Sequence, residues 1–281
     1  LQRVLHLSLV ERRVFRTERH DDPLRRVRRA TLPHRLPALL ARPALAVRVQ
    51  PAATRQRLQS GKPDMLAGLP ANPRAQQLVA PDRSGKFVGV LAESWKTDDG
   101  KVWTFNLRKG VKFHNGQELT ADDVKFIFDR ILDEKVGAAM RSTYNGIGLK
   151  TEVVDKSTVK FTIASGSGPF LNYLALLNRS AIIHKSSYNA DGTVSKIIGT
   201  GPFMLDTSKP GDSYTLKKFP DYWKKGEPLL DGVVLKVITD PNVRLNALRT
   251  GEVDLTEELP IADVKKLVEK QDPNFTTKVY Y

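Results

Sequence analysis

The sequence lacks cysteine and long apolar runs, and each absence excludes a class of protein. With no cysteine among 281 residues, disulfides, thiolate zinc sites and cysteine nucleophiles are excluded. No stretch of about 20 apolar residues occurs, so we expect no transmembrane helix. The apolar start LQRVLHLSL is interrupted by Glu11, Arg12 and Arg13, and no signal peptide is visible. A chain that begins at Leu1 rather than Met suggests a fragment.

Acidic and aromatic residues are scarce at the start of the chain. Residues 1 to 80 hold 16 Lys and Arg against 5 Asp and Glu, with Phe15 as the one aromatic residue. The remaining residues hold 29 against 26, so the net charge of +14 comes mainly from one segment. Four prolines would interrupt any helix there: Pro33, Pro37, Pro43 and Pro51.

Residues 1–77 can be interpreted in three ways. They read as a disordered basic tail, or as the translation of a wrong reading frame of GC-rich DNA, which yields excess Arg, Ala, Pro and Leu. A basic arm that binds nucleic acid is a third interpretation. It lacks the interleaved aromatic residues on which a single-stranded nucleic acid would stack. Because the rest of the chain is nearly neutral, we expect no nucleic-acid partner for it.

An ordered pattern of hairpins and helices begins near residue 81. In KVWTFNLRKGVKF, Trp103, Phe105 and Leu107 share one face of a strand. Asn115-Gly116 supplies a turn. Thr120 then caps a helix in which Asp123 reaches back to the cap. The apolar stripe of this helix comprises Val124, Ile127, Phe128 and Ile131.

Further elements predict a mixed α and β fold. TEVVDKSTVKFTI predicts a hairpin, PFLNYLALLN a short helix, and SYTLKKF and GVVLKVIT strands. Asp240 and Pro241 start a helix that ends before Gly251. PIADVKKLVEK predicts another helix, and EVDL and TTKVYY short strands. We interpret Trp95, Trp103 and Trp223 as packing residues.

Signals for catalysis or metal binding are weak. His114, next to the Asn-Gly turn, is expected to point away from the core, and His184 lies far from it in sequence. These are the two histidines after residue 81, and two scattered histidines without cysteine are a poor basis for a metal site. We therefore expect no metal and no cofactor. A hydrolase remains an alternative, although no G-x-S-x-G elbow occurs. GSGPF and GTGPF lack the Lys-Ser/Thr ending of a phosphate loop and are interpreted as turns.

Four separated stretches together resemble family 5 of the ABC-transporter solute-binding proteins, the peptide- and nickel-binding class. They are GVLAESWKTDDGKVWTFNLRKGVKFHNGQELTADDVKFIFDRI, IIGTGPFML, FPDYWKKGEPLLDGVVLKVITD and RLNALRTGEVDL. The resemblance covers residues 78–281. It implies a mixed α/β fold of the class II periplasmic-binding-protein type. Residues 78–190 would form the extra α/β domain of the peptide-binding cluster, and residues 191–281 part of the first ligand-binding lobe.

The same resemblance implies a truncated protein, because residues 1–77 do not resemble the family's leader and first strand and a second lobe is absent. It implies solute capture rather than catalysis, with a di- or oligopeptide as solute and the membrane permease of an ABC importer as partner. The family member would be a periplasmic or membrane-anchored monomer. Candidate ligand contacts are Tyr144 and Asn145 and the turn Gly199, Thr200 and Gly201. Half of a cleft is expected to bind weakly or not at all.

Overall fold

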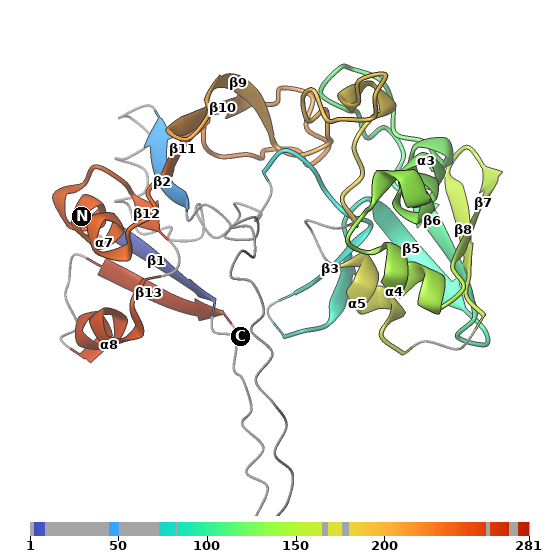
Figure 1. Cartoon of the computed structure of the whole chain (residues 1–281), viewed down its shortest axis with the longest axis horizontal. Helices are drawn as coiled ribbons and strands as arrows, with labels where there is room; N and C mark the ends of the chain where they lie inside the picture. The colour runs from blue at the N-terminus through green and yellow to red at the C-terminus, as the bar shows by residue number, and fades with distance from the viewer. Residues whose placement is uncertain are drawn as a thin grey trace, which may run out of the picture. The chain divides into compact units, whose positions relative to one another are not determined.

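The computed structural model describes residues 3–8, 45–50, 73–82, 84–164, 168–175, 180–256, 259–269 and 275–280 (Figure 1). The chain forms two compact units, one of residues 1–48 and 236–281 and the other of residues 49–235. The segment 191–235 joins the larger unit because its loops bond to residues near 76 and 112.

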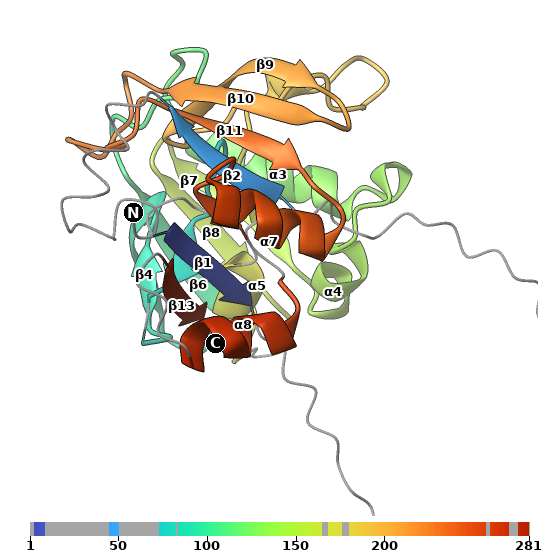
Figure 2. The same cartoon turned by 90° about the vertical axis from the view of Figure 1, so that its left-hand side faces the viewer.

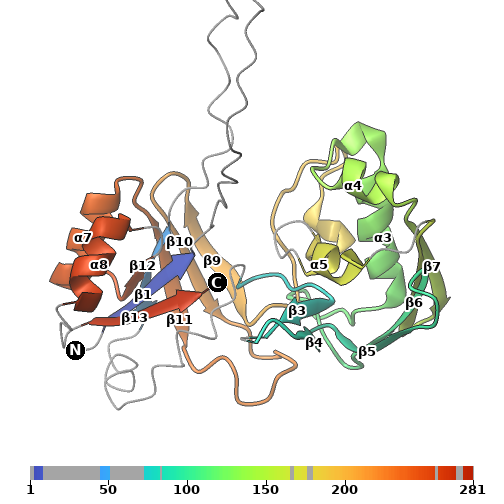
Figure 3. The same cartoon turned by 90° about the horizontal axis from the view of Figure 1, so that it is seen from below.

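The larger unit is built on a four-stranded antiparallel sheet in the order β5-β6-β8-β7. Its strands are β5 (Ala92–Thr97), β6 (Val102–Leu107), β7 (Lys150–Asp155) and β8 (Thr158–Thr162). The helices α3 (Ala121–Leu132), α4 (Arg141–Gly146) and α5 (Phe170–Leu174) lie on one side of it (Figure 3).

Between this sheet and its helices lies an aromatic core. Phe161 of β8 is fully buried and meets Phe105 of β6 at a ring-centroid distance of 5.5 Å and Phe128 of α3 at 4.9 Å. Trp103 meets Phe170 of α5 at 5.5 Å. Burying each such ring stabilises the fold by about 1.5–3 kcal/mol. The predicted inward faces of the strand and of the helix at Thr120 are therefore confirmed.

The remaining elements of this unit are short. Strands β3 (Val79–Pro81) and β4 (Phe87–Gly89) pair with each other. The 3₁₀ turns η1 (Glu134–Val136) and η2 (Lys185–Ser187) lie in connections. Strands β9 (Phe203–Lys209) and β10 (Ser213–Lys218) form an antiparallel pair, and β11 (Gly232–Val237) lies next to β10. Strands β10 and β11 were predicted from the sequence.

The smaller unit contains four strands and two helices among its described residues. The strands β1 (Arg3–Ser8), β2 (Leu45–Gln50), β12 (Leu255–Thr256) and β13 (Phe275–Tyr280) lie in the order β13-β1-β12-β2. The helices α7 (Pro241–Thr250) and α8 (Ile261–Glu269) complete it (Figure 2). Asp240 caps α7 as predicted, because its carboxylate accepts the N–H groups of Asn242 and Val243.

Two pieces of the Arg-rich segment, residues 3–8 and 45–50, lie in strands. Strand β1 pairs in parallel with β12 and β13. Strand β2 pairs with β12, where the Asp254 N–H donates to the Val47 carbonyl at 2.8 Å and Ala46 is fully buried. The stretch LAVRV alternates at the period of a strand. Its pairing partner β12 lies about 200 residues later in the chain, so the strand was not predicted from the local sequence. Our predictions for residues 9–44 and 51–72 lie outside the described residues.

The start of α3 gives a first test. Replacing Asp123 with Ala removes the carboxylate that accepts both the backbone N–H and the hydroxyl of Thr120, each at 2.9 Å. We expect the free energy of unfolding to fall by about 1 kcal/mol. Asp122→Ala is the control, since it removes the same charge from the same turn and leaves these bonds. It should cost only a few tenths of a kcal/mol. Equal losses in urea unfolding would contradict a role for the cap.

Candidate functional site

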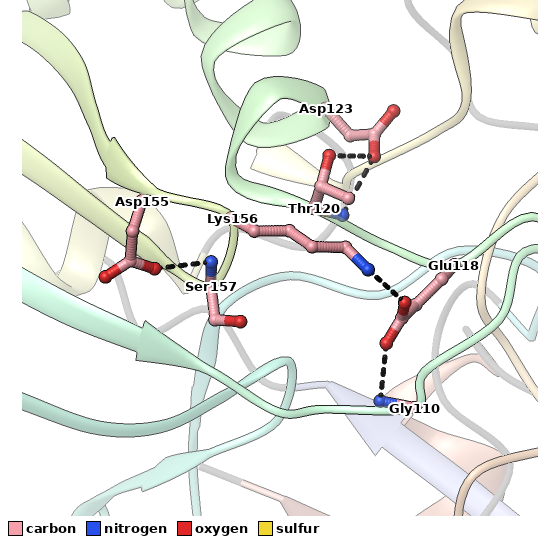
Figure 4. Close-up of polar contacts among 7 residues, drawn as sticks. All are labelled: Gly110, Glu118, Thr120, Asp123, Asp155, Lys156 and Ser157. Carbon is pink, nitrogen blue, oxygen red and sulfur yellow. Dashed lines mark hydrogen bonds and ion pairs between the residues drawn. The ribbon is translucent and has the colours of Figure 1, made fainter.

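The acidic stretch around residues 118–123 is a structural junction (Figure 4). The N–H of Ala121, in the first turn of α3, donates to the carbonyl of Lys156 in the β7–β8 turn at 2.9 Å. Glu118 accepts from Lys156 Nζ at 2.6 Å and from the Gly110 N–H at 3.1 Å. These bonds, that from Lys156 first, lower the pKa of Glu118. The acids near His114 therefore fasten the helix to a hairpin.

His114 corrects the sequence prediction, because it points inward and bonds to a distant turn. Its Nε2 lies 3.0 Å from the Gly201 carbonyl, and its Nδ1 lies 3.4 Å from the Gly199 amide nitrogen. The backbone N–H of His114 donates to the Gly199 carbonyl at 2.9 Å. The ring packs edge-on against Phe219 at 5.0 Å. Burial, with a smaller effect of the Arg74 charge, lowers the pKa of His114.

These contacts also bear on the hydrolase alternative. A general base must have a ring nitrogen available to take a proton from a substrate or a nucleophile. Both nitrogens of His114 face backbone groups of the 199–201 turn. His114 is therefore placed to hold this turn, and the constellation that a hydrolase needs does not assemble around it.

His184 is buried and serves as a cap. Its Nδ1 accepts the Ser186 N–H at 3.1 Å and also lies 2.7 Å from the Ser186 hydroxyl and 3.2 Å from the Asn115 side-chain amide. Its ring packs edge-on against Phe113 at 5.2 Å. Asn115 thus links the tip of the 111–119 hairpin to the start of η2. No group of three possible metal ligands occurs among the described residues.

The turn Gly199-Thr200-Gly201 is buried against the segment that starts at Pro73. The Gly201 N–H donates to the Arg74 carbonyl at 3.1 Å, and the Phe203 N–H to the Pro73 carbonyl at 3.1 Å. A Cβ at Gly199 would lie 2.1 Å from the Arg74 carbonyl oxygen, and one at Gly201 2.4 Å from that of Pro73. Glycine is required here by close backbone approach. The predicted turn is confirmed.

Thr200 belongs to a polar group that we call the Gln76 cluster. It comprises the buried Gln76 and Thr200 and the half-buried Tyr222 and Trp223. Gln76 Oε1 accepts from the Trp223 indole N–H at 2.9 Å and from the Thr200 hydroxyl at 3.3 Å. Gln76 Nε2 donates to the Tyr222 hydroxyl at 2.9 Å. Because both the oxygen and the nitrogen of the Gln76 side-chain amide form hydrogen bonds, the orientation of this amide is fixed.

Arg108 extends the Gln76 cluster. Its guanidinium lies 4.5 Å from the centre of the Trp223 ring, and its Nε donates to the Val90 carbonyl at 3.1 Å. Burial, the largest effect, raises the pKa of Tyr222 to about 12, so this phenol stays protonated. Gln76 was not among the residues predicted from the sequence. Its only signal is a polar pair inside the apolar stretch AQQLVA.

Tyr144 and Asn145 lie on α4 in contrasting environments. The Tyr144 side chain is fully buried, and its hydroxyl lies 3.0 Å from Ser180 Oγ and donates to the Tyr173 carbonyl at 3.2 Å. Burial raises the pKa of Tyr144 to about 12. Its ring packs edge-on against Phe128 at 5.5 Å. Tyr144 is thus a core residue without surface for a ligand, whereas Asn145 is exposed.

The structure therefore divides the five candidate residues. Gly199, Thr200 and Gly201 lie together at the Gln76 cluster, but all three are buried. Tyr144 is buried in the aromatic core, in a different environment. Asn145 alone among the five offers an exposed side chain. No described helix is long and apolar enough to span a membrane.

Comparison with known proteins identifies the family. The model of the bacterial extracellular solute-binding proteins, family 5 (Middle), matches residues 86–281. The chain belongs to this family. The family is one of solute-binding proteins, in agreement with the prediction that the chain is not an enzyme. The mixed α/β fold of the periplasmic-binding-protein type is likewise confirmed.

The proteins similar to this chain are named for different solutes. The chain is 34% identical over 212 residues to the glutathione-binding protein GsiB of Salmonella typhi, covering 74% of this chain and 41% of the relative. It is 36% identical over 219 residues to the di/tripeptide-binding protein 1 of Pseudomonas aeruginosa, covering 69% and 40%. The structure of AgaA of A. tumefaciens, in complex with agropinic acid, matches at 37% identity with a TM-score of 0.60, covering 73% and 41%. The chain thus spans about 40% of the length of the relatives it matches.

The close approach at the 199–201 turn gives a second test. We expect Gly199→Ala and Gly201→Ala each to lower the free energy of unfolding by about 2 kcal/mol or more, because the added methyl overlaps a backbone carbonyl. Gly146→Ala is the matched control, since a Cβ there has no heavy atom within 4 Å. It should leave stability within about 0.5 kcal/mol. Tolerance of alanine at both turn positions would refute this packing.

The Gln76 cluster gives a third test. Gln76→Leu leaves the Trp223 indole N–H and the Thr200 hydroxyl buried without their acceptor. We expect a loss of about 2–3 kcal/mol in urea unfolding, with a change in tryptophan fluorescence. The control is Gln117→Leu, whose side chain is exposed. A loss no larger than that of the control would show that the amide does not hold the cluster.

Proposed function

We propose that this chain contributes to solute capture for an ABC importer, with a di- or oligopeptide as solute. The observation that carries the proposal is the family match over residues 86–281. Two similar proteins, a glutathione-binding protein and a di/tripeptide-binding protein, favour a short peptide as the solute. The similar protein AgaA, whose structure is in complex with agropinic acid, makes a solute other than a peptide the alternative.

The proposed partner is the membrane permease of the importer. The proposed location is the periplasm or the outer face of the membrane, because the family is one of extracellular solute-binding proteins. We propose that the protein acts as a monomer. The extra α/β domain of residues 78–190 and the lobe of residues 191–281 remain our proposed domain division.

Within the described residues, different groups would serve capture in different ways. Asn145 is exposed and is proposed as a ligand contact. Gly199, Thr200 and Gly201 would act indirectly, by fixing the backbone and the Gln76 cluster beside them. Tyr222 and Trp223 are half-buried and held by Gln76. They are better placed to meet a ligand than Tyr144.

The polypeptide of 281 residues is expected to bind peptide weakly by itself. It spans about 40% of the length of its relatives. The entropic cost of capturing a solute is nearly the same for a partial set of contacts as for a full set. Titration calorimetry with glutathione and a pool of di- and tripeptides should detect no binding in the micromolar range. Micromolar affinity would overturn this expectation of weak binding.

A chimera tests the function itself. Residues 86–281 would replace the matching span of GsiB, and peptide binding would be compared with that of GsiB lacking this span. We expect the chimera to bind a short peptide and the deletion control to bind none. Asn145→Ala in the chimera should weaken binding, while Ser142→Ala, an exposed neighbour on α4, should not. A folded chimera that binds no peptide would contradict the proposed function.

A further inference from the structure

The side chain of Arg108 is anchored at one end and open at the other. Its Nε donates to the Val90 carbonyl at 3.1 Å, and its guanidinium carbon lies 4.5 Å from the centre of the Trp223 ring. Among the residues that the structure describes, neither Nη1 nor Nη2 of Arg108 has a hydrogen-bond or ion-pair partner. Because Arg108 is half-buried, these nitrogens are held by the protein and remain within reach of a dissolved molecule.

Two other arginines of the larger unit have protein acceptors for the same nitrogens. Arg130 also lies over an aromatic ring, at 3.9 Å, but its Nη2 donates to the Gly192 carbonyl. Arg141 is also anchored to a backbone carbonyl through Nε, but its Nη2 lies 3.4 Å from the Glu134 carboxylate. Arg108 combines the ring contact of the first with the Nε anchor of the second, and lacks the acceptor that both have.

Tyr222 supplies a second donor at the same place. Its hydroxyl oxygen accepts the Gln76 Nε2–H at 2.9 Å, so the hydroxyl hydrogen can be donated to another group. The described residues provide no acceptor for it. Burial raises the pKa of Tyr222 to about 12, against a smaller opposing effect of the Arg108 charge, so the hydroxyl keeps its hydrogen at neutral pH. The Tyr222 ring lies 5.5 Å from that of Trp223, over which Arg108 is placed.

The acids near these donors are already paired with lysines. Asp221 lies 3.0 Å from Lys112 Nζ, and Glu227 lies 2.5 Å from Lys224 Nζ. Each pair is close to neutral, so no carboxylate of the described residues cancels the charge of Arg108. A group that completes this site must therefore carry negative charge and accept hydrogen bonds.

A carboxylate has the chemistry that these donors require. Because Nε is occupied by the Val90 carbonyl, the two terminal nitrogens of Arg108 remain as a fork, and such a fork binds both oxygens of a carboxylate. One guanidinium offers one unit of charge. That charge balances a carboxylate, whereas a phosphate, with nearly two negative charges, would be only half compensated. The Trp223 ring adds an apolar surface for the carbon atoms beside the carboxylate.

We propose that Arg108 and Tyr222 form a binding site for a carboxylate, with Trp223 packed against the guanidinium, and that the terminal carboxylate of a short-peptide solute occupies it. The identity of the solute rests on the proposed function, whereas the affinity of the site for a carboxylate does not. The proposal also gives Gln76 a role in binding, because its amide holds the Trp223 indole and the Tyr222 hydroxyl beside each other.

NMR spectroscopy of the 281-residue chain tests the site with acetate as the probe. We expect the indole N–H signal of Trp223 to shift with sodium acetate and not with sodium chloride at equal ionic strength. A dissociation constant on the order of 1 mM is expected for so small a ligand. The internal control is the indole N–H of Trp103, which donates to the Gly100 carbonyl at 3.0 Å and should not shift. Dialanine should shift the Trp223 signal, and dialanine amide, which lacks the carboxylate, should not.

Variants assign the binding to particular groups. Arg108→Gln should weaken acetate binding by about tenfold or more, because it removes a charged donor. Arg108→Lys should weaken it less, since lysine keeps the charge without the fork. Tyr222→Phe removes the second donor and should weaken binding by about threefold. The matched control is Lys109→Gln, which removes a positive charge from the exposed neighbouring residue and should leave binding unchanged.

Three results would overturn the proposal: no shift at Trp223, an equal shift with chloride, or binding that survives Arg108→Gln while the Trp103 signal shows a folded chain. Binding of acetate without binding of dialanine would overturn the assignment to a peptide. The GsiB chimera separates this inference from the proposed function. Peptide binding by the chimera that Arg108→Gln leaves unchanged would refute the carboxylate site alone. Acetate binding by the 281-residue chain, with a chimera that binds no peptide, would refute the proposed function alone.

Discussion

The close backbone approach of residues 73–75 to residues 199–201 is the constraint on which the rest of the site depends. Backbone oxygens of Pro73 and Arg74 occupy the space where a side chain at Gly201 or Gly199 would begin. With the turn held there, Thr200 can reach Gln76 and the Gly201 carbonyl can face His114. The Gln76 cluster and the contacts of His114 therefore depend on Gly199 and Gly201 having no side chain. A residue with a Cβ at either position would push the turn away from residues 73–75.

Local signals in the sequence predicted the elements well, because the groups that satisfy one another are only a few residues apart. Thr120 with Asp123 and Asp240 with Asn242 are examples. Contacts distant in sequence were not predictable in the same way. The alternation near His114 suggested an outward ring, yet its partners lie 85 and 87 residues away. Gln76 has partners 124 to 147 residues away, and strand β2 needs β12 to complete its bonds.

The family resemblance was correct about the fold and less informative about individual residues. Tyr144 was a candidate because of its place after α3, but its burial and its bond to Tyr173 are those of a core tyrosine. Gly199 and Gly201 were candidates because of their place in a motif, and their role here is to admit a neighbouring backbone. A motif can therefore be retained for packing that supports a site as readily as for contact with a solute.

The 199–201 turn is held by groups from distant parts of the chain. The Gly201 N–H donates to the Arg74 carbonyl, and the backbone N–H of His114 donates to the Gly199 carbonyl. Thr200 bonds to the amide of Gln76, which does not titrate, and Tyr222, with a pKa of about 12, remains a phenol near neutral pH. Because most of these bonds come from the backbone or from groups without charge, the position of the turn depends on packing and close backbone approach rather than on the charge of one side chain.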